Sequence, residues 1–394
     1  MSTNNPESMR ATVTVEDVRR VMDTAYPPHL AESWDRVGLT CGDPAEPVRR
    51  IAVALECTDA VADAAIESGA DMIVVHHPLM LRGVTSVAAD TAKGRIVHKL
   101  IRAGVALFSA HTNADSARPG VNDELAELLG VTPGAPLAPK PAPALDSWSV
   151  KVPESHAEEV KKAVFDAGAG TIGEYSECAF TLAGTGQFTP SDDAEPFLGA
   201  AGATEQVNEL RIEFVAPKSI RTRVFSALVA AHPYEEPAFD IVESQATGLK
   251  PEELLGIGRV GTLDYPMRFK DFVERVAERL PKTEWGVRGA GDPERMIHTV
   301  AVASGSGDSF LDTVHKLGVD AFVTSDLRHH PVDEALRAGG PQGEAAPCIV
   351  DTAHWASEFP WCRQAADLLS GELGIPAEVL SERTDPWTVA SRGR

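Results

Sequence analysis

The fold of this chain is decided by one short stretch, Met72-Ile73-Val74-Val75-His76-His77-Pro78. Four consecutive apolar residues are typical of a strand buried on both faces, as in a parallel sheet. Two imidazoles follow directly, and open α/β sheets bind their ligands at the carboxyl ends of strands. Pro78 favours an extended backbone at His77, so the two side chains point to opposite sides and suit two different metal ions. The alternative is a pair of surface histidines on a loop.

Helices and strands alternate around this stretch. The sequence predicts strands at 51–55, 72–75 and 105–108 and helices at 16–24, 60–68 and 95–103. Asp59 is placed to cap the helix at 60–68, and Gly69 is placed to end it. Because strands that alternate with helices form βαβ units, we expect a mainly parallel sheet with helices on its faces.

The same pattern recurs in the C-terminal part of the chain. At a fixed offset and without a gap, Ile51-Ala52-Val53-Ala54 matches Val300-Ala301-Val302-Ala303. Further matches at that offset pair Asp59 with Asp308, Gly69 with Gly318, Asp71 with Asp320 and Val74 with Val323. Each copy is predicted to form a strand, a capped helix, a glycine stop and a strand. We therefore expect two repeated α/β halves that form one composite domain.

A proline-rich stretch separates the first half from a different unit in the middle. Residues 132–145 alternate proline with alanine at several positions, which favours a semi-rigid linker and excludes a helix or a central strand. A βαββαβ-like pattern over about 146–245 then predicts a small α+β, ferredoxin-like domain. The predicted domains are the N-terminal half at 1–131, the linker at 132–145, the inserted domain at 146–250 and the C-terminal half at 251–394.

Composition restricts the possible partners and compartment. The 394 residues are 43% hydrophobic and 24% charged, as in ordinary globular proteins, and no apolar run is long enough to span a membrane. The formal net charge of -22 would repel a phosphate backbone, so nucleic-acid binding is disfavoured. Five scattered cysteines without a CxxC motif fit free thiols and no thiolate zinc site, and the N-terminus lacks a secretory signal. We expect a cytoplasmic protein.

Two more strand ends carry metal-ligand side chains. His111 and Asp115 follow the strand at 105–108, and His354 and Glu358 follow an apolar strand and lie four apart, on one face of a helical turn. Turn and helix capping are the alternatives for these residues. The combined set offers imidazole and carboxylate without thiolate, which suits two divalent ions such as Zn, Mn, Fe, Co or Ni. The predicted ligands are His76, His77, Asp115, His354 and Glu358.

Several segments together resemble one known family. They are the strand followed by His76-His77-Pro78, Ser109–Asp115, the late His354 and Glu358 pair, Glu32–Leu39 and Ala231–Pro237. This pattern, over about 12–390, is similar to the NIF-three-like family, also called GTP cyclohydrolase I type 2 homologues. The resemblance implies a two-metal site with the five ligands named above and His111 beside them. It also implies a PII- or CutA-like inserted domain and a homohexamer.

The predicted function is that of a metal-dependent hydrolase of the cyclohydrolase or phosphohydrolase type. A water that bridges the two ions would be the nucleophile, and His111 or His330 would transfer protons. The name of the family suggests a purine nucleotide as the small-molecule ligand. The alternatives are metal storage or delivery and a regulatory oligomer without enzymatic activity. Ser304–Asp308 is interpreted as a plain turn and Trp34 as a packing residue.

Overall fold

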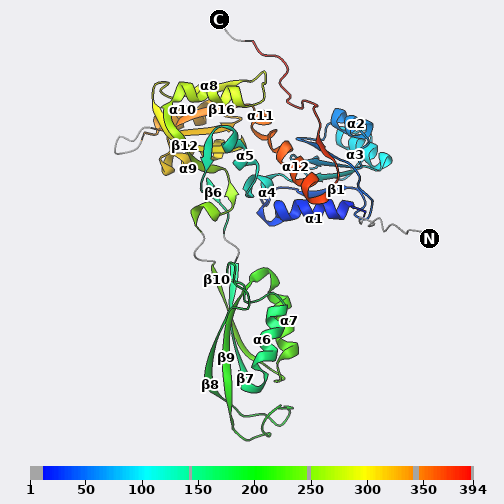
Figure 1. Cartoon of the computed structure of the whole chain (residues 1–394), viewed down its shortest axis with the longest axis vertical. Coiled ribbons are helices and arrows are strands. Elements are labelled where there is room, and N and C mark those ends of the chain that lie inside the picture. The colour runs from blue at the N-terminus through cyan, green and yellow to red at the C-terminus, as the bar shows by residue number, and fades with distance from the viewer. Residues whose placement is uncertain (1–11, 142–143, 246–249, 340–345, 392–394) are drawn as a thin grey trace, which may run out of the picture. The chain divides into compact units, whose positions relative to one another are not determined.

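The chain divides into two compact units (Figure 1). The computed structural model describes residues 12–141, 144–245, 250–339 and 346–391. Unit 1 comprises 1–140 and 250–394, and unit 2 comprises 141–249. Unit 2 is therefore an insertion into the sequence of unit 1. In the described part of the chain, no helix combines the length and the hydropathy that crossing a membrane requires.

The first sheet of unit 1 contains the strand that precedes His76. Its order is β1 (Gly38–Cys41), β4 (Ala106–Ser109), β3 (Met72–Val75), β2 (Ile51–Ala54) and β17 (Ala377–Val379). All pairs are parallel except β1 with β4. Alternate strand residues enter two different cores, so helices cover both faces. These helices are α2 (Asp59–Glu67) and α3 (Ala92–Ala103) on one face and α1 (Val15–Ala25) and α12 (Trp361–Leu373) on the other.

The start of α2 differs by one residue from the prediction. Thr58, and not Asp59, is the N-cap, because its hydroxyl accepts a hydrogen bond from the amide of Val61 at 3.2 Å. Asp59 is the first helical residue, where its negative charge interacts favourably with the helix dipole.

The second sheet has a mixed strand arrangement. Its order is β13 (Val287–Ala290), β16 (Cys348–Thr352), β15 (Ala321–Ser325), β14 (Met296–Ser306), β12 (Arg259–Arg268) and β5 (Val131–Pro133). Only β14 with β15 and β15 with β16 are parallel. The expectation of mainly parallel strands is therefore wrong for this sheet. The first half of β12 alternates between buried and less buried residues, as antiparallel strands with one solvated face do.

The repeat appears as two equivalent βαβ units. In the first, β2, α2 and β3 follow one another; in the second, β14, α9 (Leu311–Leu317) and β15 do. Both turns before the last strand use a glycine in the left-handed region, Gly69 at φ +73° and Gly318 at φ +65°. Other residues adopt this conformation at a cost, which explains why glycine occurs at the same place in both copies.

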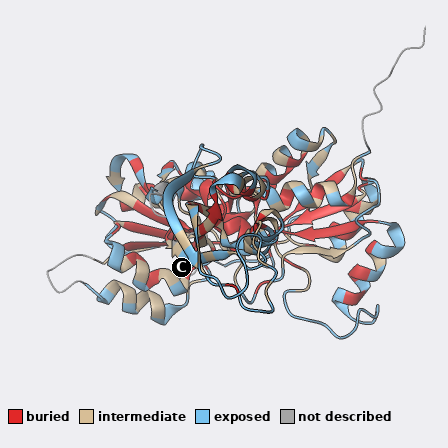
Figure 2. Ribbon diagram, turned by 90° about the horizontal axis from the view of Figure 1, so that it is seen from below, coloured by how far each residue is buried: buried red, intermediate tan, exposed pale blue. Residues whose placement is uncertain are grey.

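The two halves of unit 1 share one hydrophobic core. Helices α4 (Thr112–Ser116), α5 (Val121–Leu128), α11 (His354–Glu358) and α12 lie between the two sheets, whose central strands are buried (Figures 1 and 2). Short segments also cross between the halves, since β17 joins the first sheet and β5 joins the second. Residues 251–394 thus do not form the second half alone, and the predicted linker at 132–145 supplies an edge strand to it.

The remaining described elements of unit 1 are two helices, a two-stranded pair and three short turns. They are α8 (Phe269–Arg279), α10 (His329–Arg337), the two-stranded pair β6 (Ala138–Pro139) with β11 (Gly256–Ile257), and 3-10 turns at Pro28–Leu30, Pro251–Glu253 and Asp308–Phe310.

Unit 2 has the βαββαβ order expected from its sequence. Its elements are β7 (Ala144–Pro153), α6 (Ala157–Asp166), β8 (Ala179–Phe188), β9 (Glu205–Pro217), α7 (Arg221–Ala231) and β10 (Ala238–Gln245), with 3-10 turns at Glu154–His156 and Lys218–Ile220. The antiparallel sheet has the order β10-β7-β9-β8, which is the ferredoxin-like arrangement. Trp148 is fully buried and stacks on Phe214 and Phe239, so unit 2 has its own core.

Candidate metal centre

Six side chains that follow strand ends converge between the two halves of unit 1. His76 and His77 directly follow β3. His111 is the N-cap of α4, which follows β4, and Asp115 lies within that helix. His354 and Glu358 are the first and last residues of α11, which follows β16. The structure thus brings together all five predicted ligands and His111. The ring centroids of His76 and His77 are 5.0 Å apart, and those of His77 and His354 are 5.3 Å apart.

Glu358 lies at the centre of this cluster. One of its oxygens, Oε2, is 2.8 Å from Nε2 of His77 and 3.1 Å from Nε2 of His354. The other, Oε1, is 3.8 Å from Nε2 of His76, which is also 3.8 Å from Oδ1 of Asp115. Two groups of side chains have ligand atoms close enough together to hold a metal ion. The first group is His76, His77 and His111, and the second is His77, His354 and Glu358. His77 therefore belongs to both groups, whereas His76 belongs to the first.

Each of the four histidines has its Nδ1 atom held by an acceptor outside the cluster. The contacts are His76 to the Ala110 carbonyl at 2.8 Å, His77 to Glu56 at 3.2 Å, His111 to Asp35 at 2.9 Å and His354 to Asp326 at 2.6 Å. A neutral imidazole that donates its Nδ1 proton keeps a lone pair on Nε2, so the second nitrogen can bind a metal ion. This arrangement fixes the tautomer and the ring direction of all four histidines.

The buried donor atoms of the cluster lack hydrogen bonds that would satisfy them. His76 is fully buried and its Nε2 atom has no hydrogen-bond partner, while Oε2 of Glu358, in a side chain that is 3% exposed, faces only the Nε2 atoms of His77 and His354. Buried polar atoms without partners are costly, so they need another interaction. Imidazole nitrogens and carboxylate oxygens directed at a common space are the donors that divalent transition metals prefer. The residues therefore fit one or more bound cations.

Burial and the neighbouring charges shift the pKa values of His77 and Glu358 in opposite directions. Burial opposes the charge on His77, but the carboxylate of Glu358 outweighs it and raises the pKa of His77 to about 9. Burial also opposes the charge on Glu358, yet His354 and His77 hold the pKa of that carboxyl well below its usual range. Burial raises the pKa of Asp115, and the negative charge of Glu358 raises it further. Two repelling carboxylates thus share one buried space.

The segment from Ser304 to Asp308 supports the cluster and is not a plain turn. Gly305 lies at φ +63° at the end of β14, and a Cβ there would meet Oε1 of Glu358 at 2.3 Å. Only glycine allows the backbone to approach this carboxylate so closely. Ser304 donates a hydrogen bond from its hydroxyl to Asp115 at 3.1 Å. The sequence interpretation missed both contacts because glycine and serine are also the usual residues of turns.

Three acidic residues that orient the histidines were not predicted. Asp35 accepts hydrogen bonds from His111 and Thr112 that outweigh its burial and bring its pKa well below the usual range. Glu56 and Asp326 hold His77 and His354. A signal existed for Asp326, because it occupies the position in the second repeat that His77 occupies in the first.

A cavity of about 670 Å³ opens beside the cluster. Its lining includes two aromatic residues and three serines, which are Trp34, Phe310, Ser304, Ser306 and Ser309. Trp34 is 54% exposed, and its ring meets the ring of His111 edge-on at 5.9 Å. The structure does not support the interpretation of Trp34 as a packing residue, because more than half of its side chain is exposed and it lines this cavity. His330 is exposed at the start of α10 and is not brought into the cluster.

Comparisons with known proteins agree with this architecture. The Duf34/NIF3 (NGG1p interacting factor 3) family matches residues 13–386. A Mycobacterium tuberculosis protein called GTP cyclohydrolase 1 type 2 homolog is 50% identical over 96% of this chain and 97% of its own, and a Bacillus subtilis protein of the same name is 37% identical over 89% and 91%. A solved Bacillus cereus protein related to NIF3 has a TM-score of 0.78 at 34% identity, covering 97% of this chain and all of its own. The chain belongs to the Duf34/NIF3 family.

Proposed function

We propose that this chain is a divalent-metal-dependent hydrolase with a dinuclear centre. The observation that carries the proposal is the common orientation of four histidines, each held at Nδ1 by an acceptor and each presenting Nε2 to one buried space. A structural role for these histidines would require no such uniform orientation.

The donor positions divide into two sets that Glu358 connects. His76, Asp115 and Oε1 of Glu358 would hold one ion, while His77, His354 and Oε2 of Glu358 would hold the other. His111 belongs to the first set, because Asp35 fixes its Nδ1 and leaves Nε2 for the cluster. We therefore assign His111 to metal binding and not to proton transfer. The ligand types suit Zn, Mn, Fe, Co or Ni.

Two ions in this position would supply Lewis acidity and would lower the pKa of a water molecule between them. The protein contributes the rest of the reaction environment. Glu358 and Asp115 are buried, so their charges act at low dielectric. The hydroxyl of Ser304 donates a hydrogen bond to Asp115 and so orients its carboxylate. The exposed position of His330 gives no geometric support to its proposed part in proton transfer.

The adjoining cavity suits a small substrate with a flat ring. Its volume of about 670 Å³ lies in the range of small-molecule sites. Trp34 offers an exposed aromatic face, and three serines offer hydroxyl groups. The GTP cyclohydrolase name of the relatives motivates a purine nucleotide as the first substrate class to test.

Metal analysis together with a substrate screen tests the proposal. Wild-type protein should retain two divalent ions per chain, and His76→Ala with His354→Ala should lose them while remaining folded. His98→Ala with His315→Ala, on α3 and α9 away from the cluster, is the matched control. Metal-loaded wild type should hydrolyse a purine nucleotide or a phosphoester. Bound metal without any turnover would contradict the hydrolase and favour metal storage, delivery or a regulatory role.

Three further expectations from the family resemblance belong to the proposal. We propose that the chain assembles as a homohexamer, that unit 2 is a PII- or CutA-like domain, and that the protein acts in the cytoplasm. The ferredoxin-like strand order supports the second of these. The exposed Phe180 and Val242 in unit 2, at 60% and 63%, are consistent with an apolar surface used in assembly.

A further inference from the structure

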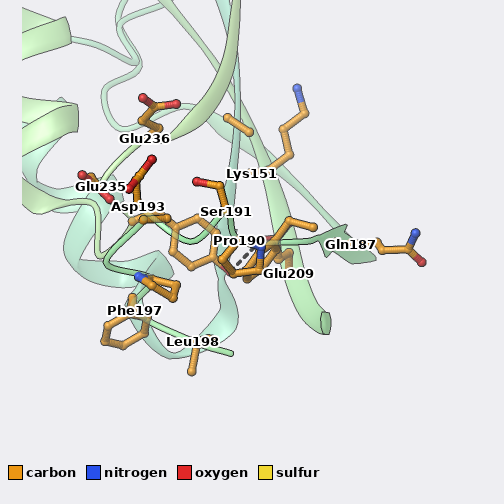
Figure 3. Close-up of a pocket in the computed structure, with 16 residues that line it drawn as sticks. Lys151, Gln187, Pro190, Ser191, Asp193, Phe197, Leu198, Glu209, Glu235 and Glu236 are labelled. Carbon is orange, nitrogen blue, oxygen red and sulfur yellow. Dashed lines mark hydrogen bonds between the residues drawn. The ribbon is translucent and has the colours of Figure 1, made fainter. Parts of the chain in front are cut away.

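Unit 2 contains a cavity of its own, which the metal centre does not involve. It has a volume of about 600 Å³ and lies between the ends of β8 and β9 and the loop that precedes β10. Figure 3 shows side chains from these segments around it, with the carboxylates of Asp193, Glu235 and Glu236 on the same side. This volume lies within the range of small-molecule sites.

Aromatic rings form one wall of the cavity. The ring centroid of Tyr234 lies 5.7 Å from that of Phe188 and 6.4 Å from that of Phe197. The Tyr234 loop is fixed by His232, which is 7% exposed and uses both ring nitrogens, one on the Lys151 carbonyl at 2.9 Å and one on the Tyr234 amide at 3.0 Å. Tyr234 is therefore held in place without a ligand.

The polar part of the cavity lining is mainly acidic. Four acidic residues line the cavity, which are Asp193, Glu209, Glu235 and Glu236. Among the described residues, none of the four forms a salt bridge. The one basic residue of the lining, Lys151, is already paired with Asp240 at 2.5 Å. The cavity thus carries a negative charge that no salt bridge among the described residues neutralises.

Glu209 is the best-placed of these carboxylates. The hydroxyl of Tyr234 donates a hydrogen bond to its Oε1 atom at 2.9 Å, which directs the group and leaves Oε2 without a hydrogen-bond donor. Gly186 makes room for it, because a Cβ at this position would lie 2.2 Å from Oε2. A carboxylate oriented beside aromatic rings is the arrangement that recognises an organic cation, since the ring faces attract positive charge.

We propose that the cavity of unit 2 binds a small organic ammonium ion, with the charged nitrogen at Glu209 and the aliphatic part against Phe188, Tyr234 and Phe197. A metal ion would use the carboxylates but would gain nothing from the aromatic wall. A neutral or anionic ligand would leave four carboxylates unpaired in the lining. The inference is independent of the metal centre, because every residue of this cavity lies in unit 2.

Calorimetric titration of the full-length protein tests the proposal. The probes are 1,4-diaminobutane and tetramethylammonium, with 1,4-butanediol as the neutral counterpart. Sodium chloride at about 0.15 M screens the general attraction of cations to a chain with net charge -22. Both ammonium probes should bind saturably, and Glu209→Gln should weaken the binding of the diamine at least about tenfold. Glu159→Gln on α6 makes the same change of charge at a residue that does not line the cavity and should have no effect.

A second variant keeps the test decisive if Glu209→Gln does not fold. Phe197→Ala removes a ring that is 48% exposed, so the fold should tolerate it. It should weaken tetramethylammonium binding several-fold, because that probe depends on ring faces and has no hydrogen to donate. Absence of saturable binding by either ammonium probe would overturn the proposal. So would butanediol binding as tightly as the diamine, or Glu159→Gln weakening the diamine as much as Glu209→Gln.

Discussion

The substitution Glu358→Gln in metal-free protein isolates the central electrostatic interaction of the candidate centre. Glutamine keeps the size of the side chain and removes its charge. In the wild type, Glu358 outweighs burial and raises the pKa of His77 from 6.5 to about 9. This difference of about 2.5 units corresponds to roughly 3 kcal/mol of interaction. In the variant, burial and the charge of His354 lower the pKa of His77 and only the hydrogen bond to Glu56 still raises it, so this pKa should fall well below 9, toward 6.5.

The same interaction makes stability depend on pH. Because the folded pKa of His77 is raised, its contribution is fully present below pH 6.5 and is lost as the pH rises through about 9. The pKa of Glu358 is lowered, so its contribution is present above its ordinary value of 4.5 and is lost as the pH falls. Glu358→Gln should therefore lower the free energy of unfolding by up to about 3 kcal/mol near pH 6, and by much less near pH 10.

Two measurements on chelator-treated protein check this prediction. An NMR titration of the histidine ring protons follows the pKa of His77, and urea unfolding near pH 6 and pH 10 gives the stability difference. Glu378→Gln, at an exposed residue of the edge strand β17, is the control for loss of one carboxylate. A His77 pKa that stays near 9 in Glu358→Gln would refute the reasoning, and so would an equal loss of stability at both pH values.

Three other changes probe the supports of the fold and the centre. Asp35→Asn should weaken metal binding about 10- to 100-fold, measured by competition with a chelating dye, because His111 loses its orienting acceptor. Asp123→Asn should lower the free energy of unfolding by about 3–5 kcal/mol, since it leaves the fully buried Arg259 without its counter-ion. Trp148→Ala should destabilise unit 2 by about 3–5 kcal/mol in denaturant unfolding and leave metal content unchanged, because all candidate ligands lie in unit 1.

Matched controls distinguish these effects from general ones. Asp90→Asn changes an exposed carboxyl and should alter neither metal affinity nor stability. Tyr175→Ala removes an aromatic ring from unit 2 that is 75% exposed, so its effect on stability should be small. Unchanged metal affinity in Asp35→Asn would remove the support for His111 as a ligand. Loss of metal in Trp148→Ala would contradict the independence of the two units.

Much of the candidate site could be predicted because its ligands follow strand ends. Apolar runs before His76, His111 and His354 mark the strands, and in each of the two sheets the parallel strands deliver their carboxyl ends to one edge. The orienting acceptors could not be predicted in the same way. Asp35 and Glu56 lie outside any periodic pattern, and their roles depend on side-chain directions that only the packed structure fixes.

The fold, too, could be predicted only in part from the sequence. The repeat predicted β2, β3, β14 and β15, because short buried strands and left-handed glycines leave a clear pattern. The exchange of β17 into the first sheet could not be predicted, since a three-residue strand has too little pattern to reveal its partner. Long-range pairing is decided by the shared core of the two halves, and sequence periodicity describes only local structure.

The position of the centre between the two halves gives metal binding a structural consequence. His76, His77 and Asp115 come from the first half, whereas His354 and Glu358 come from the second. Burial places the carboxylates of Asp115 and Glu358 close together, which costs free energy because like charges repel at low dielectric. A bound cation would neutralise that repulsion and join ligands from both halves, so binding would stabilise the folded state of unit 1. The fold therefore brings the ligands together at an electrostatic cost, and bound cations are what would offset it.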